Sequence, residues 1–130
     1  MASSHFVTID FGSIDPEHGA PAADRIISGD PQFRTWNCDE ADGGLYAGIW
    51  EATPGKWRIV YDEWEFCHIL SGRSIVTEEG GKEQHLQAGD SFVLRPGFRG
   101  TWEVIETTHD GCASVLHTHH STSNRSNPWK

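Results

Sequence analysis

Short apolar segments separated by turn residues fill the central part of the chain, and several of them alternate apolar and polar positions. Alternation of this kind is typical of β-strands with one buried face, and no stretch shows the longer period of an amphipathic helix. The predicted strands cover residues 45–52, 57–61, 64–70, 73–78, 84–86, 91–94, 101–106 and 112–117. Short strands at this spacing predict an all-β, antiparallel barrel or sandwich of six to ten strands over about residues 25–117.

Turn residues stand between these segments. Asp42-Gly43 predicts a hairpin turn, and Gly80-Gly81, Gly89-Asp90 and Pro96-Gly97 mark further corners. Glycine at a barrel corner supplies the positive φ that other residues adopt only with strain, and proline fixes φ in advance. The turns therefore favour a closed, tightly cornered barrel.

The two ends of the chain differ from its centre. Residues 1–24 form a polar and acidic extension, in which residues 5–11 are apolar enough for a short strand that could swap with a neighbouring subunit. Residues 118–130 are polar and predict a flexible tail, whose His-Thr-His-His sequence at 117–120 would capture metal only adventitiously. We expect one barrel domain over residues 25–117.

Charge and composition exclude several classes of function. The 130-residue chain carries 19 acidic and 10 basic residues, a net charge of −9, and this argues against a nucleic-acid partner. The sequence has no apolar run long enough to cross a membrane and no signal-peptide pattern at its start, so we expect a cytoplasmic protein without membrane contact. Three cysteines without CxxC spacing make a poor disulfide framework.

Several sequence strings carry a resemblance to a known family. They are SGDPQFRTW at 28–36, GIW at 48–50, TPGKW at 53–57, YDEWEFCHIL at 61–70, GDSFV at 89–93 and GFRGTWEV at 97–104. Over residues 25–108 the chain resembles small stand-alone cupins of unknown function, which are related to ureidoglycine aminohydrolase and ethanolamine-utilisation protein Q. The resemblance implies a cupin-like (RmlC-like) double-stranded β-helix, which is a small antiparallel barrel.

Most metal ligands of the cupin pattern are missing from this sequence. The resemblance places Glu65 at the glutamate position, but Ile59 and Tyr61 stand at the two histidine positions of the first motif. The third histidine position falls at Gly100 or Thr101. Because three of four ligand positions lack the expected donor, we expect no bound metal and no other cofactor.

Alternation selects the residues that face the barrel interior. Glu65 and Cys67 share one face of their strand, and the resemblance turns that face inward together with Tyr61 on the preceding strand. Glu65 is the candidate catalytic base or ligand-binding carboxylate, with buried structural acid as the alternative. Cys67 lies on the same face as a candidate ligand contact, although its neighbour Glu65 disfavours a reactive thiolate and favours a small buried filler.

Two further residues complete the candidate site. Glu63 is expected at the rim of the barrel, and Trp102 is expected to form an aromatic wall beside Tyr61 and Glu65. Such a pocket combines apolar walls with a few polar groups, and it suits a small polar ligand that bears a cation or an amine.

The opposite face of the same strand is also apolar, at Trp64, Phe66 and Leu70. A sheet that is apolar on both faces needs a second cover, which predicts a homodimer with a self-complementary interface.

Two ligand-dependent functions remain open on these grounds, beside a purely structural or partner-binding module whose barrel is filled by its own aromatic side chains. The first is a metal-free cupin that binds a small polar molecule in its barrel, with or without a weak enzymatic activity. The alternative is a metal-dependent cupin enzyme of the aminohydrolase type that acts on a small nitrogenous metabolite. That enzyme would use Glu65 with unconventional ligands such as Glu63, Tyr61 or a histidine from elsewhere in the chain.

Overall fold

The described part of the computed structural model, residues 5–12 and 14–115, is built almost entirely of β-strands. Its strands are β1 (Glu17–Gly19), β2 (Ile26–Gly29), β3 (Phe33–Ala41), β4 (Leu45–Ala52), β5 (Gly55–Val60), β6 (Trp64–Glu78), β7 (Glu83–Gln87), β8 (Ser91–Leu94) and β9 (Arg99–Val115). The helical content of these residues is one turn of 3-10 helix, Ala23–Arg25. The predicted all-β class is confirmed, and within these residues no helix is long and apolar enough to span a membrane.

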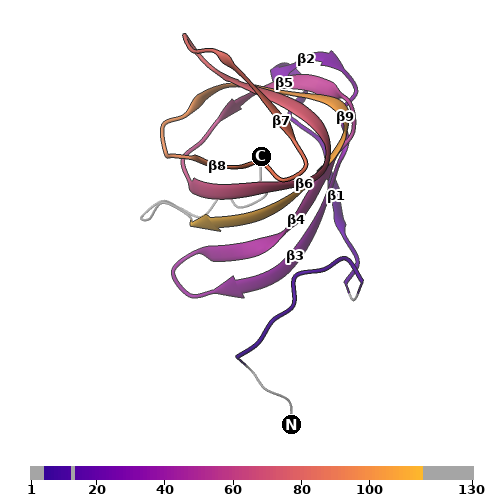
Figure 1. Ribbon diagram of the computed structural model, residues 1–130, viewed down its shortest axis with the longest axis vertical. Helices are drawn as coiled ribbons and strands as arrows, with labels where there is room; N and C mark the ends of the chain where they lie inside the picture. Colours follow the sequence, from indigo (N-terminus) through magenta and orange to yellow (C-terminus); the bar gives the residue numbers. More distant parts are fainter. Residues whose placement is uncertain (1–4, 13, 116–130) are drawn as a thin grey trace.

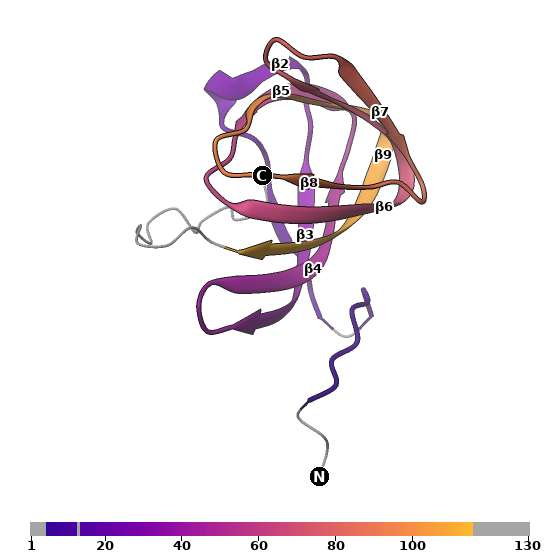
Figure 2. The same ribbon diagram turned by 60° about the vertical axis from the view of Figure 1, so that its left-hand side comes forward.

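The strands form one antiparallel sheet that curls around on itself (Figures 1 and 2). Along the sheet the order is β1-β3-β4-β9-β5-β2, and β6 pairs with β7, β8 and β9. The long strands β6 and β9 run against each other from the Trp64–Val115 pair to the Glu78–Gly100 pair. Strand β9 also pairs with β4 and β5, and β6 with β7 and β8, so these two long strands connect most of the sheet.

Continuous strands β6 and β9 replace four predicted strands, at 64–70, 73–78, 101–106 and 112–117. The predicted break at Ser71-Gly72 is instead a bend, with register shifts in the β6–β9 pairing on both sides of Ser71. Gly72 has a φ of 88°, and a Cβ at this position would overlap the carbonyl oxygen of Thr107. The glycine allows close backbone approach within a strand, so it does not end the strand.

The N-terminal extension differs from the prediction. The described residues 5–12 form no strand, and the short strand of the extension is β1, which pairs with β3. In Figures 1 and 2 most of the indigo N-terminal segment extends away from the barrel. The segment still contacts β3 through Phe11, whose ring packs edge-on against Trp36 with 4.8 Å between the ring centroids. The predicted flexible tail, 118–130, lies outside the described residues, and the domain limits stay a prediction.

The core lies inside the curled sheet and is dominated by aromatic rings. Trp50, Trp57 and Trp102 are fully buried there with Ile59 and Ile69. Large rings suit a short chain because each one removes a large area from water. The outer face of β6, β8 and β9 keeps apolar side chains about 37 to 44% exposed, at Trp64, Phe66, Leu70, Val93 and Val115. Both faces of this part of the sheet are thus apolar, as the sequence predicts.

Candidate functional site in the barrel interior

Glu65 lies on the inner face of β6 and is 0% exposed. Its backbone pairs with Leu94 of β8 on one side and with Ser114 of β9 on the other. Burial alternates along this strand, with Glu65 and Cys67 buried and Phe66 exposed. The inward orientation of Glu65 and Cys67 predicted from the sequence is therefore confirmed.

Tyr61 holds the Glu65 carboxylate in place. Its phenol hydroxyl donates a hydrogen bond of 2.6 Å to Glu65 Oε1. The Tyr61 backbone is itself fixed, because its N–H donates to the carbonyl of Phe98 at 2.8 Å and its carbonyl accepts from Gly97 N–H at 2.7 Å. The predicted Pro96-Gly97 corner thus positions the phenol. A short O–H···O bond to a carboxylate is among the stronger hydrogen bonds of a protein.

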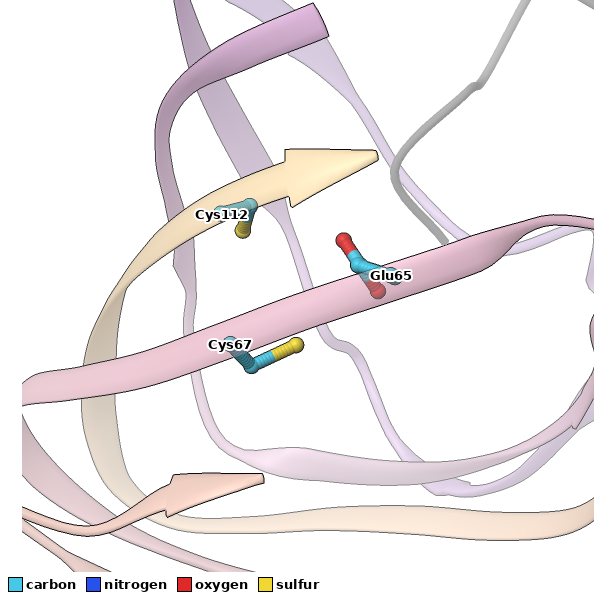
Figure 3. A group of neighbouring side chains, drawn as sticks. All are labelled: Glu65, Cys67 and Cys112. Atoms are coloured by element: carbon cyan, nitrogen blue, oxygen red, sulfur yellow. The ribbon is translucent and has the colours of Figure 1, made fainter. Parts of the chain in front are cut away.

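Two cysteines converge on the same carboxylate. Cys67 of β6 and Cys112 of β9 are direct partners in the antiparallel register, and both are buried as thiols. The ligand atoms of Glu65, Cys67 and Cys112 all lie within 4.8 Å of one another. Figure 3 shows the three side chains gathered in one region of the two adjacent strands. Sequence reasoning gave Cys112 no role, because only the strand pairing brings it beside Cys67.

Other polar side chains lie beside this group on β9. Ser114 is 1% exposed and donates a hydrogen bond of 3.2 Å to Glu63 Oε1. Glu63 is half-buried, and its place at the rim of the barrel stays a prediction. Asp110 is also fully buried, two residues before Cys112. The interior therefore carries more acidic groups than the sequence analysis selected.

Trp102 belongs to the same buried cluster as Tyr61 and forms part of an aromatic wall. Its ring stacks on Trp57 at 6.5 Å and meets Trp50 edge-on at 5.1 Å. Phe92, whose backbone pairs with Cys67, lies 6.0 Å from Trp102 and links this wall to the cysteines. That Trp102, Tyr61 and Glu65 line one ligand pocket stays a prediction.

The indole nitrogens of the wall differ in their partners. Trp102 Nε1 donates to Ser74 Oγ at 3.1 Å, and Ser74 Oγ lies 2.8 Å from Thr108 Oγ1. The indole nitrogen of Trp57 is buried and has no hydrogen-bond partner within the described residues. Buried donors are nearly always paired, so an unpaired one at a candidate site indicates a place for a ligand or a water.

The usual metal positions of a cupin do not fit a metal here. Ile59 is aliphatic and buried, and its partner on β9 is Gly100, so neither side chain offers a donor atom. The Tyr61 hydroxyl already donates to Glu65. Of the residues at these positions Glu65 alone offers a carboxylate, and Thr101 offers at most a neutral hydroxyl.

A second polar group lies apart from the Glu65 cluster and was not predicted from the sequence. Arg34 forms two bonds to Glu51, with Nε 2.6 Å from Oε1 and Nη2 3.0 Å from Oε2. His109 Nε2 lies 2.9 Å from Glu51 Oε2, and Ser71 Oγ lies 2.9 Å from His109 Nδ1. The hydrogen bonds from Arg34 hold the pKa of Glu51 below its usual range, with the charges of Arg34 and His109 adding to the effect.

This second group ties four strands together. Because an ionised carboxylate only accepts hydrogen bonds, His109 donates to Glu51 through Nε2, and its Nδ1 shares a hydrogen bond with the Ser71 hydroxyl. The order Ser-His-Glu also occurs in hydrolases, but Glu51 here is neutralised by a bidentate arginine. We therefore assign a structural role to these four side chains.

Comparison with known proteins identifies the fold. Residues 39–110 match the family model described as the EutQ-like cupin domain. The resemblance predicted from the sequence is thus confirmed, and with it the cupin-like barrel. No curated protein sequence matches the chain.

Solved structures agree with this assignment. A protein of unknown function from Pseudomonas syringae pv. tomato matches with a TM-score of 0.73 and 23% identity, over 82% of this chain and 46% of that one. The chain therefore spans about half the length of that relative. The EutQ protein of Clostridium difficile matches with a TM-score of 0.62 and 11% identity, over 82% and 99% of the two chains. A EutQ protein from Salmonella typhimurium matches with a TM-score of 0.59 and 12% identity, over 80% of this chain and 98% of that one. Identities this low show a common fold alone.

Proposed function

The chain belongs to the EutQ-like cupin family, and from this fold and its acidic interior we propose that the protein binds a small polar molecule inside the barrel. The ligand would carry a nitrogen that donates to, or is held beside, the Glu65 carboxylate. Tyr61 and the aromatic wall around Trp102 would fix its orientation. Glu63 at the rim and Cys67 beside Glu65 would contribute further contacts.

The burial of Glu65 is the observation that carries this proposal. An ionised carboxylate at 0% exposure is costly unless hydrogen bonds or a cationic partner compensate it. Natural ligand sites are mostly apolar cavities with a few aimed polar groups. A carboxylate bound by a phenol, whose ring belongs to a buried cluster rich in tryptophan, has this composition.

The ligand chemistry follows from the charges and donors of the interior. Glu65 and Asp110 are both fully buried acids, which favours a ligand with a cationic or hydrogen-donating nitrogen over an anion. Aromatic faces also attract a cation. The unpaired Trp57 indole donor would be satisfied by an acceptor atom elsewhere on the ligand. A small molecule with an amine and an oxygen acceptor fits both requirements.

Replacement of Glu65 by Gln tests the proposal. Gln keeps the shape and can still accept the Tyr61 hydrogen bond, but it removes the charge. A panel of small amines and amides is screened by thermal shift, and each hit is measured by calorimetry. We expect Glu65→Gln to abolish binding of the hits while it changes the free energy of unfolding by about 1 kcal/mol or less.

Glu78→Gln is the matched control, because Glu78 lies at the exposed end of the same strand. It makes the same chemical change and should leave both binding and stability unaltered. The proposal fails if no amine or amide binds the wild-type protein. It also fails if Glu65→Gln retains full affinity for the hits.

A further inference from the structure

We propose that Glu65, Cys67 and Cys112 form a binding site for a thiophilic divalent cation, with Zn²⁺ as the reference ion. The site shares Glu65 with the usual cupin ligand positions, but its two other donors are cysteines outside that pattern. This inference rests on the proposed function only because both place their ligand beside Glu65 inside the barrel.

The geometry of the three side chains suits one small cation. Their ligand atoms lie within 4.8 Å of one another. In a tetrahedral site with Zn–S bonds of about 2.3 Å, the ligand atoms lie about 3.8 Å apart, so a contraction of roughly 1 Å is enough. Cys67 and Cys112 are direct cross-strand partners, and Glu65 is two residues from Cys67 on the same face. Small side-chain rotations would therefore close the site without a shift of the backbone.

The chemistry of the donors selects the class of ion. Two thiolates favour Zn²⁺ and other soft or borderline metals over Mg²⁺ and Ca²⁺, which prefer oxygen ligands. The thiols bind as thiolates, so a bound M²⁺ takes the place of the two thiol protons, which pass to the buffer. Two thiolates and one carboxylate then carry three negative charges against the two positive charges of the ion.

Simple packing explains these side chains less well. A buried cysteine alone is an ordinary small apolar filler. Here two thiols lie beside a carboxylate that is 0% exposed, and a carboxylate is a poor neighbour for an apolar filler. A cation between the three groups would compensate the charge of Glu65. Tyr61 would stabilise the bound cation indirectly, because its hydrogen bond to Oε1 orients the Glu65 carboxylate.

Three protein donors leave one position of a tetrahedral ion open, as in catalytic zinc sites. That position would take an uncharged nitrogen or oxygen of a small molecule. A cationic amine held by Glu65, as in the proposed function, would instead compete with the ion for this carboxylate.

The test is a metal titration of the full-length protein, reduced and stripped with a chelator. Zn²⁺ binding is measured by competition with a chromophoric chelator, and Co²⁺ binding by its absorption spectrum. The tail histidines His117, His119 and His120 are replaced by Ala in the background, which removes adventitious capture. We expect one ion per chain in this background, with a thiolate-to-cobalt charge-transfer band.

Single substitutions assign the ligands. Cys67→Ala, Cys112→Ala and Glu65→Gln should each weaken Zn²⁺ binding by more than about 100-fold, beyond the 10- to 100-fold effect of losing a supporting group. Tyr61→Phe should fall within that smaller range. Cys38→Ser is the matched control, because Cys38 lies on β3 outside the cluster, and it should bind as the background does. Circular dichroism confirms that each variant is folded.

The outcomes separate the two proposals. The metal site is refuted if the background protein binds no Zn²⁺ or Co²⁺ with its thiols reduced. It is equally refuted if the ion is retained when either Cys67 or Cys112 is replaced. If amines then still bind in a Glu65-dependent manner, the proposed function stands without the metal. If the ion binds as expected but no small molecule does, the metal site stands and the proposed function fails.

Discussion

The hydrogen bond from Tyr61 to Glu65 is a feature whose energetic weight can be measured directly. Tyr61→Phe removes one hydroxyl and leaves the ring that packs in the core. Because Glu65 is fully buried, no bulk water reaches Oε1 to replace the lost donor. Hydrogen bonds to charged groups contribute about 1.5–3 kcal/mol, so we expect the free energy of unfolding to fall by about that amount.

A double-mutant cycle with Glu65→Gln isolates this bond from other effects of the lost hydroxyl. In the Glu65→Gln background the same change breaks a neutral hydrogen bond, which is worth about 0.5–1.5 kcal/mol. The coupling free energy should therefore be roughly 1 kcal/mol. Urea denaturation of the four metal-free proteins at neutral pH, followed by tryptophan fluorescence, supplies the values.

A Tyr61→Phe protein as stable as the wild type would contradict this expectation. So would strictly additive effects of the two substitutions, because additivity means that the two side chains do not interact.

Features away from Glu65 give three further predictions. Gly72→Ala should destabilise the protein by about 1–3 kcal/mol more than Gly80→Ala in urea denaturation, because both glycines have positive φ but only Gly72 would meet backbone within the barrel. Equal effects would contradict the close approach. Glu51 has a lowered pKa, so its contribution to stability is complete above about pH 5 and is lost as the pH falls below about 4.3. The difference in unfolding free energy between wild type and Glu51→Gln should shrink over that range, and a constant difference would refute it. Light scattering at micromolar concentration should give a dimer mass that Phe66→Lys reduces to that of a monomer, because Phe66 is an exposed apolar residue on the outer face of β6. A monomeric wild type would contradict this.

The sequence predicts the inner face of β6 correctly because side-chain direction in a strand alternates with every residue. Alternation puts Glu65 and Cys67 on one face of the strand and Phe66 on the other, and the cupin resemblance turns the first face inward. The turn at Gly97 is also predictable, because proline presets φ for a turn and glycine adopts the positive φ that the next position needs. These signals are local, and each needs only a few neighbouring residues.

The features that the sequence did not predict depend on pairing between distant strands. Cys112 becomes part of the candidate site only through its register with Cys67, and no local motif encodes that register. The contact between Glu51 and His109 likewise depends on the pairing of β4 with β9. The sequence predicts a strand end at Gly72, whereas β6 continues through it. Its close approach to Thr107 exists only in the folded barrel.

The pairing of β6 with β9 also has a kinetic consequence. It joins residues about 20 to 50 positions apart, from Glu78–Gly100 to Trp64–Val115, and contacts this distant in sequence form slowly. Cys67 and Cys112 are as far apart in the chain, so an unfolded chain offers no local chelate of the kind that nucleates a zinc finger. A cation would therefore enter only after the barrel has closed, and refolding should proceed at the same rate whether or not metal is present.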